Sequence, residues 1–278
     1  MSRYSRINPH EIFERLFSNL GPPTEASRQA AEAKMQRIEE SPDRDSFYLK
    51  LDIRHPARIT WVCNLERVLG YRTLSYETYF PLIHEHYRGI YLEFGVAAYQ
   101  LSKKHMTSLR SEDPAYSILV PLLHQSGQYY WMRQVSEPLE FDAEGQLVSQ
   151  INTYRYVGAF TGPISNRPMV EFGTTQRMDI AQEVSDIALR RILESFLSEL
   201  TEIHVKTALT YLRLYDPDAN PRPTSGMVGE EMDRKVATVR SYNKEILSEL
   251  RYAFPMSDFP TMVEFAKFLY LTFGKPKP

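Results

Sequence analysis

Residues Thr224 to Leu250 read TSGMVGEEMDRKVATVRSYNKEILSEL. Within each half of this stretch the apolar residues recur three, four and seven positions apart, which predicts helices that each bury one face. These apolar residues are Val228, Met232, Val236, Val239, Ile246 and Leu247. The charged run from Asp233 to Lys235 separates the two halves. The stretch therefore predicts two short helices joined by a tight turn.

Two features at the start of this stretch favour the same arrangement. Thr224 or Ser225 can cap the first helix, because a side-chain oxygen at that position accepts a hydrogen bond from a free backbone N–H of the first turn. Gly229 leaves no side chain where two crossing helices would approach most closely. A helix-turn-helix needs this arrangement. Any helical hairpin with a small residue at its crossing would give the same pattern, so that alternative stays open.

The order of residue types carries a resemblance to a known family. Thr-Ser-x-x-Val-Gly-Glu-Glu-Met, followed by Val-x-Thr-Val-Arg-Ser-Tyr-Asn-Lys, is similar to the C-terminal DNA-binding domain of LuxR-type regulators. In that family a scanning helix opens with Thr or Ser, and a recognition helix reads Val-x-Thr-Val-Lys-x-His. This chain has Tyr242 in place of the common His and Gly229 in place of the common Ala. The resemblance implies double-stranded DNA as a partner.

Under this interpretation the N-terminal part of the second helix enters the major groove. Thr238, Ser241 and Asn243 are short or polar enough to contact base edges. Lys235, Arg240 and Lys244 would hold phosphates, which gives affinity that depends on salt but no choice of sequence. The alternative is a ligand-sensing or protein-interaction module whose helix-turn-helix no longer binds DNA. The acidic residues Glu230, Glu231 and Asp233 favour that alternative, because they would repel phosphate.

Upstream of this unit the sequence alternates in the manner of β-strands. Strands are expected at residues 47–53, 58–63, 116–123, 128–137 and 147–160, with helices at 64–71 and from 76 to about 104. Gly127 and Gly145 are expected in hairpin turns, which need a positive φ. Two strands, then helices, then three antiparallel strands is the order of a PAS domain.

Four short motifs in the expected order resemble the PAS family. They are Leu69-Gly70-Tyr71, Tyr79-Phe80-x-x-Ile83-His84, Ser126-Gly127-x-Tyr129-x-Trp131 and Phe141-Asp142-Ala143-Glu144-Gly145. The resemblance covers roughly Phe47 to Phe160 and implies a sheet wrapped around a cavity where a sensor holds a small molecule. The sequence identifies neither the residues that bind it nor a cofactor.

Length and patterning together predict the domain organisation. A chain of 278 residues exceeds the size at which one domain is expected. The expected fold class is α+β, a PAS-like antiparallel sheet with helices followed by an all-α helix-turn-helix domain. The expected parts are N-terminal helices (1–44), a PAS-like sensor (45–160), a linker with a connector helix at 179–200 (161–200), and a LuxR-like domain (201–278). The connector is either a dimer contact, which would make a homodimer, or a plain core helix.

Composition and motifs exclude several other classes. The formal net charge is −2, so attraction to DNA must come from local charge. Between Arg234 and Arg251 the sequence has five cationic residues and two acidic ones. No Gly-rich phosphate loop or nucleophile elbow is present, so no enzyme activity is expected. His84, His86 and His124 are interpreted as structural rather than as metal ligands. The single cysteine, Cys63, and the lack of a long apolar segment predict a cytoplasmic protein that does not enter the membrane.

Overall fold

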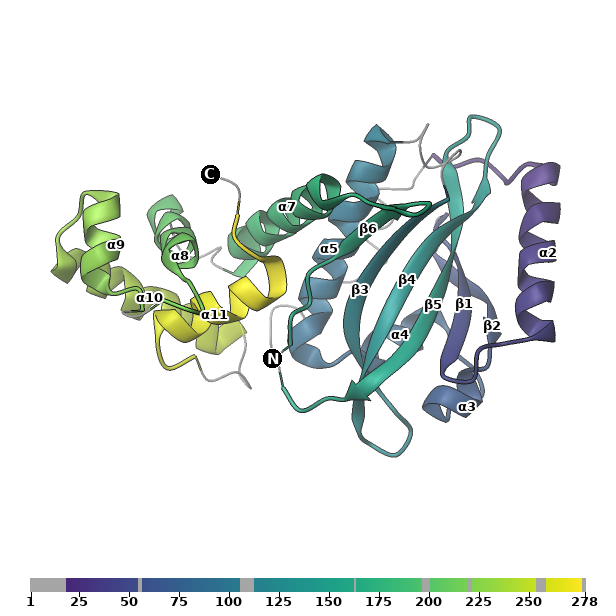
Figure 1. The fold of residues 1–278 in the computed structure, drawn as a ribbon, viewed down its shortest axis with the longest axis horizontal. Helices are drawn as coiled ribbons and strands as arrows, with labels where there is room; N and C mark the ends of the chain where they lie inside the picture. Colours follow the sequence, from purple (N-terminus) through teal and green to yellow (C-terminus); the bar gives the residue numbers. More distant parts are fainter. Residues whose placement is uncertain are drawn as a thin grey trace.

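A computed structural model describes residues 19–54, 57–105, 113–162, 164–196, 201–219, 222–253 and 259–276. An antiparallel sheet with helices on both sides forms one end of the molecule, and a group of helices forms the other (Figure 1). The first of the expected N-terminal helices lies outside the described residues. The second is α2 (Glu25–Glu40), which Thr24 caps by accepting a hydrogen bond from the backbone N–H of Ser27.

The sheet has seven strands within the described residues, and every neighbouring pair is antiparallel. The strands are β1 (Ser46–Asp52), β2 (Arg58–Cys63), β3 (Pro114–Leu123), β4 (Tyr129–Phe141), β5 (Leu147–Ala159), β6 (Met169–Phe172) and β7 (Thr175–Gln176). Their order is β2-β1-β5-β4-β3-β6-β7. The five strands expected from the sequence are therefore confirmed, and the two predicted glycines take positive φ values of 86° at Gly127 and 73° at Gly145.

The segment after β5 extends the sheet. The sequence analysis treats 161–174 as part of a linker, yet Met169–Phe172 forms β6 and pairs with β3. Val170 and Phe172 are buried against the main core. A four-residue strand between Pro168 and Gly173 is too short for its alternation to be visible in the sequence.

Between β2 and β3 the chain forms α3 (Leu65–Leu69), α4 (Tyr76–Leu82) and α5 (Glu85–Lys104). The expected helical segment 76–104 is confirmed and consists of two helices, α4 and α5. The break has a clear cause: Ile83 forms a β-bridge with Leu122, and the backbone N–H of His84 donates to the carbonyl of Pro121 at 2.9 Å. His84 then caps α5 through its Nδ1, which accepts from the N–H of His86.

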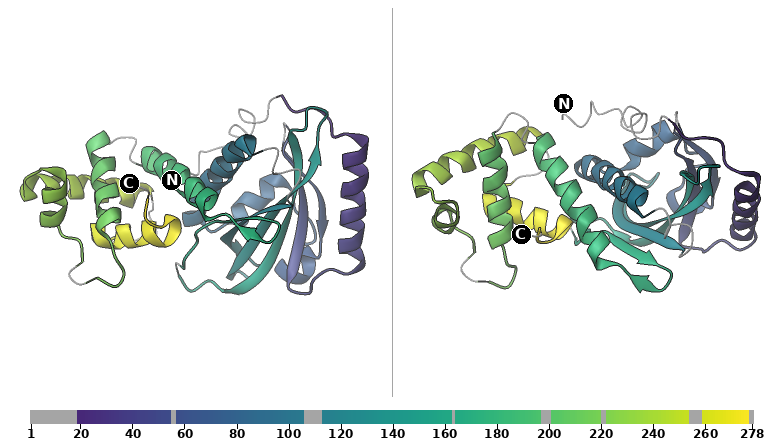
Figure 2. Two further views of the ribbon diagram at one scale, coloured as in Figure 1. Left: turned by 45° about the horizontal axis from the view of Figure 1, so that its top comes forward. Right: turned by 90° about the horizontal axis from the view of Figure 1, so that it is seen from above.

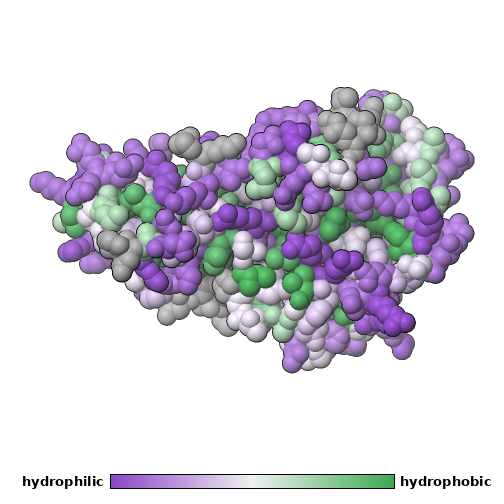
Figure 3. Space-filling view, viewed as in Figure 1, coloured by the Kyte–Doolittle hydropathy of each residue, from purple (hydrophilic) through white to green (hydrophobic). Residues whose placement is uncertain are grey.

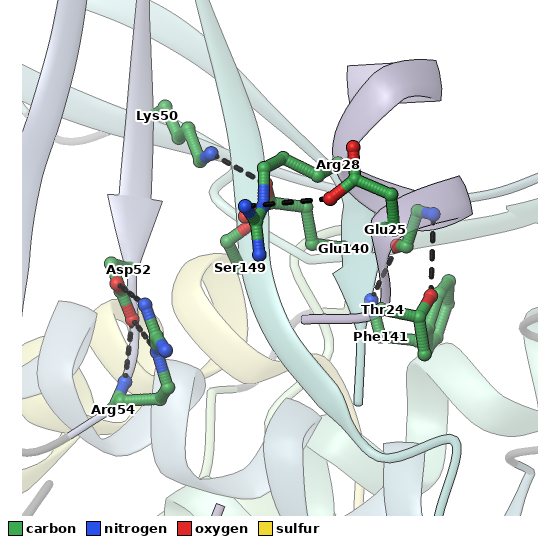
Figure 4. Close-up of polar contacts among 10 residues, drawn as sticks. Thr24, Glu25, Arg28, Lys50, Asp52, Arg54, Glu140, Phe141 and Ser149 are labelled. Carbon is green, nitrogen blue, oxygen red and sulfur yellow. Dashed lines mark hydrogen bonds and ion pairs between the residues drawn. The ribbon is translucent and has the colours of Figure 1, made fainter. Parts of the chain in front are cut away.

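The two faces of the sheet are covered differently. The face toward α4 and α5 carries the main core, in which the rings of Phe47 and Tyr154 stack at 4.5 Å. Helix α2 lies on the opposite face, over Leu139 and Ile151 (Figure 2). Close to α2 that face also carries charged groups, with Lys50 Nζ 2.8 Å from Glu140 Oε1 (Figure 4). One face of the sheet therefore carries the main apolar core, and the other carries a smaller apolar cluster beneath α2 together with ion pairs.

Helix α7 (Met178–Phe196) packs along α5 and leads from the sheet into the helical part of the molecule. That part comprises α8 (Glu202–Leu214), α9 (Ser225–Met232), α10 (Val236–Ala253) and α11 (Met262–Phe273). Among the described residues, no helix combines the length and the apolar composition needed to cross a membrane.

Candidate nucleic-acid interface and ligand cavity

The expected pair of helices joined by a tight turn is confirmed as α9 and α10. Thr224 caps α9 by accepting a hydrogen bond from the N–H of Met227. Asp233 ends α9 in the left-handed conformation (φ 52°), and the N–H of Arg234 then donates to the carbonyl of Gly229 at 2.8 Å. A Cβ built on Gly229 would lie 2.7 Å from the carbonyl oxygen of Arg234. The glycine therefore allows the turn to fold back over α9.

Helix α10 has one buried and one exposed face. Val239, Ile246 and Leu250 are fully buried, as is Val228 on α9. Val236 was expected on the buried face, but its side chain is 40% exposed. It is the first residue of α10, next to the turn, where the facing helix no longer covers it. The apolar spacing thus predicts the buried face correctly except at the end of the helix.

Most of the predicted DNA-contacting residues are exposed on α10 or next to its start. Lys235, Arg240, Ser241 and Lys244 are exposed, and Thr238 is half-buried. Residues three and four apart share a helix face, so Arg240, Ser241 and Lys244 are neighbours. The Ser241 hydroxyl donates to Glu245 at 3.2 Å. On the face drawn in Figure 3, hydrophilic side chains cover much of the helical end of the molecule, and apolar side chains gather nearer its middle.

Asn243 has a different setting from the other predicted residues. Its Nδ2 donates to the hydroxyl of Tyr211 at 2.7 Å and to that of Ser225 at 3.2 Å. The Asn243 Oδ1 is buried and has no hydrogen-bond partner among the described residues. These contacts tie α10 to α8 and to the start of α9. The geometry therefore gives Asn243 a positioning role inside the group of helices α8 to α11, which we call the helical unit.

The acidic residues that favour the alternative function lie beside the turn. Glu230, Glu231 and Asp233 are exposed. None of the ion pairs found among the described residues involves these three carboxylates. Their charge therefore faces solvent on the side of the unit where α10 begins.

His204 is a residue that the sequence analysis did not select. It is 6% exposed, and its Nδ1 accepts the backbone N–H of Thr201 at 3.2 Å, which completes the N-terminal cap of α8. Its Nε2 lies 3.1 Å from Glu245 Oε2 on α10. Because Nδ1 accepts, Nε2 carries the proton and donates to the carboxylate. The spacing Thr-x-x-His, with His at the third helical position, is the signal that could have identified it.

A cavity of about 160 Å³ lies between the sheet and the helices α4, α5 and α7. Its lining is mainly apolar and includes Leu49, Leu51, Leu92, Val96, Ile180 and Val184. Tyrosines add neutral polar groups: the Tyr79 hydroxyl donates to Tyr91 at 2.9 Å and lies 2.7 Å from the hydroxyl of Tyr154. Burial raises the pKa of Tyr79 and Tyr154 well above the usual value, so both stay protonated.

Two polar atoms in this lining remain unsatisfied. Gln134 is 4% exposed, and its Nε2 donates to Ser136 at 2.8 Å. Among the described residues, neither Gln134 Oε1 nor the hydroxyl of Tyr116 has a hydrogen-bond partner, although both are buried. Leaving a buried polar atom unpaired costs about 1–3 kcal/mol. The side chain of Gln134 therefore keeps, at the cavity wall, an acceptor that the fold leaves unpaired.

The three histidines considered in the sequence analysis, His84, His86 and His124, do not line the cavity. The His84 ring packs 4.7 Å from both Tyr129 and Phe160, and burial, with a smaller contribution from His86, lowers the pKa of His84 to about 4. His124 shares a hydrogen bond with Ser126 in the β3–β4 hairpin. Over the described part of the chain no three His, Cys, Asp or Glu side chains gather in a way that could hold a metal ion.

No protein-family model matches the chain, and no curated protein matches its sequence. Solved structures show a weak likeness to VqmA. Phage VqmA in complex with DPO is 12% identical, covering 89% of this chain and 94% of its own, at a TM-score of 0.26. Vibrio cholera VqmA with ligand and DNA is 11% identical, covering 89% and 90%, at 0.25. A Vibrio cholerae VqmA dimer, described among LuxR-type receptors, is 15% identical, covering 62% and 61%, at 0.19. TM-scores this low support no conclusion about the fold or the function of this chain.

Proposed function

We propose that this chain is a DNA-binding transcription regulator in which a PAS-like sensory domain controls a C-terminal helix-turn-helix. The observation that carries the proposal is the surface of α10, where Arg240 and Lys244 flank Ser241 on an exposed face. The capped helix α9 and the tight turn at Gly229 support a helix-turn-helix, because they hold α10 against the rest of the unit and leave that face open.

In this proposal the N-terminal half of α10 lies in the major groove. Thr238 and Ser241 contact base edges, while Lys235, Arg240 and Lys244 hold phosphates. Asn243, which the sequence analysis grouped with the base-contacting residues, keeps its partners Tyr211 and Ser225 and positions the helix instead. A homodimer would offer two copies of α10 to two half-sites about one helical turn of DNA apart.

The sheet supports the sensory half of the proposal. Residues 45–160 run as two strands, helices and three antiparallel strands, and the helices cover a cavity. A cavity of about 150 Å³ can hold benzene, so the 160 Å³ here fits a molecule of about one ring. The buried polar groups Gln134, Tyr116 and Tyr154 are neutral. The lining also includes Glu137, which already pairs with Lys34 at 3.2 Å, and His105. We propose a small neutral ligand with a hydrogen-bond donor.

The domain limits follow from these roles. Residues 201–278 form the output domain, and 1–44 precede the sensor. Residues 161–200 connect the two, with β6 adding to the sheet and α7 acting as the connector helix.

The test is an electrophoretic shift with a pool of genomic duplex fragments, followed by a salt titration of one retained fragment. Replacing both Arg240 and Lys244 with Ala should reduce the slope of log K against log salt by about 2, since each phosphate contact contributes about 0.9. Lys267→Ala, which removes an exposed cation of α11 that pairs with Glu264, serves as the matched control. An unchanged slope in the double variant would show that α10 is not the DNA-binding surface.

The second candidate is a sensing module whose helix-turn-helix does not bind DNA. The exposed carboxylates of Glu230, Glu231 and Asp233 favour it, because they lie beside the start of α10 and repel phosphate. If the wild-type protein retards no fragment at low salt, this second function replaces the first.

A further inference from the structure

Two of the helices that line the cavity, α5 and α7, also contact the helical part of the molecule. Leu92, Gly95 and Val96 of α5 line the cavity, together with Ile180 and Val184 of α7. A Cβ built on Gly95 meets no atom within 4 Å, so this point of α5 opens onto free space. A molecule in the cavity would therefore touch the connector helix directly.

The neighbouring residues of α5 face the other way. Glu93 is 3% exposed and pairs with Arg191 of α7, whose Nε donates to Glu93 Oε2 at 2.5 Å. The ring of Phe94 lies 5.2 Å from Phe273 of α11. Over five residues, α5 thus contacts the cavity, the connector helix and the last helix of the output domain.

The C-terminal end of α11 is fixed to the sheet by a second contact. Asn166, 2% exposed, accepts the backbone N–H of Leu119 in β3 through its Oδ1, and its own N–H donates to the carbonyl of Leu271, both at 2.9 Å. The guanidinium of Arg167 lies 4.6 Å from the centre of the Tyr270 ring. The last carbonyls of a helix have no partner within it, and here the segment between β5 and β6 supplies one.

From α11 the contacts continue to α8 and then to α9 and α10. The rings of Tyr270 and Tyr215, at the end of α8, are 5.4 Å apart. One packed series of elements therefore joins the cavity to the helix that carries Arg240 and Lys244.

We propose that the junction of α5, α7 and α11, which we call the docking junction, couples ligand binding to the position of the output helices. A molecule that fills the cavity holds these helices docked on the sensor. The reason is energetic. A molecule in the cavity contacts Ile180 and Val184 only while α7 lies on α5, so its binding favours the docked state over any state in which α7 has moved away. Because such coupling is reciprocal, weakening the contact of α11 with the segment between β5 and β6 must also weaken the packing of α7 at the cavity wall. This inference rests on the sensory half of the proposed function.

The test uses hydrogen–deuterium exchange of the full chain, without DNA, so that its outcome is independent of DNA binding. Asn166→Ala removes the side-chain bond to β3, and Gly95→Leu places a side chain into the cavity in the manner of a built-in ligand. We expect Asn166→Ala to speed exchange about fivefold or more in α11 and also at residues 180–188 of α7. We expect Gly95→Leu to slow exchange by a similar factor in α7 and in α11, which Gly95 does not contact.

Three further variants keep the test decisive. Gly95→Ala is the milder replacement should Gly95→Leu not fold, and Gly226→Ala on α9 controls for the general gain of replacing a helical glycine. Arg155→Ala, which breaks the exposed pair with Asp43 near the start of β1, controls for general loosening. If Asn166→Ala affects α11 alone, or if filling at Gly95 alters only α5 and the adjoining strands, the docking junction does not couple the two parts and the proposal fails.

Discussion

The cavity and the exposed face of α10 both carry polar side chains, but in opposite surroundings. At the cavity the hydroxyls of Tyr79, Tyr91 and Tyr154 are neutral and satisfy one another. On α10 the charged groups Arg240 and Lys244 stand in solvent. Buried polar groups cost stability when they lose a partner, whereas exposed charges contribute little to folding. Substitutions in the two regions should therefore separate effects on folding from effects on binding.

The helical unit has its own buried region, and the largest expected effect is at its turn. Gly229→Ala should destabilise the protein by about 1–3 kcal/mol, since the added Cβ would lie 2.7 Å from the backbone carbonyl oxygen of Arg234, which cannot move freely. Gly226→Ala is the matched control on the same helix, where the nearest atom is Thr224 Oγ1 at 3.5 Å. Denaturant unfolding measures both. Equal stability of the two variants would contradict the close approach at Gly229.

A pH effect should follow from His84. Its pKa in the folded protein is lowered to about 4, mainly by burial, against an ordinary value of 6.5. The unfolded chain therefore binds the proton first as pH falls, and stability should decrease from about pH 6.5 down to about pH 4. Because the ring keeps partial contact with solvent, the expected loss is about 1–2 kcal/mol.

Replacing His84 with Phe removes one titrating group and should make the stability curve shallower over this pH range. Some slope should remain, because burial also lowers the pKa of His86. His124→Asn, in the β3–β4 hairpin, is the control for replacing a histidine elsewhere in the fold. The measurement is the urea midpoint at half-unit steps of pH. A curve that keeps its slope in His84→Phe would assign the effect to another group.

The tyrosines of the cavity allow a comparison in which the signs differ. Tyr154→Phe removes a buried hydrogen bond to Tyr79 and should cost about 1 kcal/mol, or a few degrees in Tm. Tyr116→Phe removes a buried hydroxyl that has no hydrogen-bond partner among the described residues, so it should leave Tm unchanged or raise it. Thermal unfolding of the two variants tests this. Equal losses would mean that Tyr116 has a partner in solution.

Repetitive local patterns made much of the fold predictable. The alternating residues of β2 gave its bounds, Arg58–Cys63, and the spacing on α9 and α10 gave their buried faces and the turn between them. These signals are local, because each depends on residues a few positions apart. The hairpin glycines were predictable for the same reason, since the turn requires their backbone conformation.

The features that the sequence did not reveal depend on contacts between distant segments. The break before α5 results from Ile83 meeting Leu122 across the fold. β6 exists because β3 offers it an open edge, and Asn243 is drawn inward by Tyr211, 32 positions away. The cavity lining comes from elements spread between β1 and α7, so no single stretch could indicate it. Such pairings follow from the assembled sheet and helices.

The smallest expected effect on folding is at the face of α10 that is proposed to contact DNA. Arg240→Ala and Lys244→Ala should each change the free energy of unfolding by less than about 0.5 kcal/mol, because both side chains are exposed and neither forms a hydrogen bond or ion pair with another described residue. Glu245→Gln is the informative companion, since it weakens the contact with His204 Nε2 while leaving the helix length and the cations unchanged. If the charges on α10 serve DNA binding alone, the two alanine variants lose salt-dependent affinity for DNA at unchanged stability. Glu245→Gln should lose some stability. It should keep or gain affinity for DNA, because one acid fewer lies beside the phosphates. A loss of stability in Arg240→Ala comparable with that at Gly229 would mean that this face is part of the packing and not a free surface.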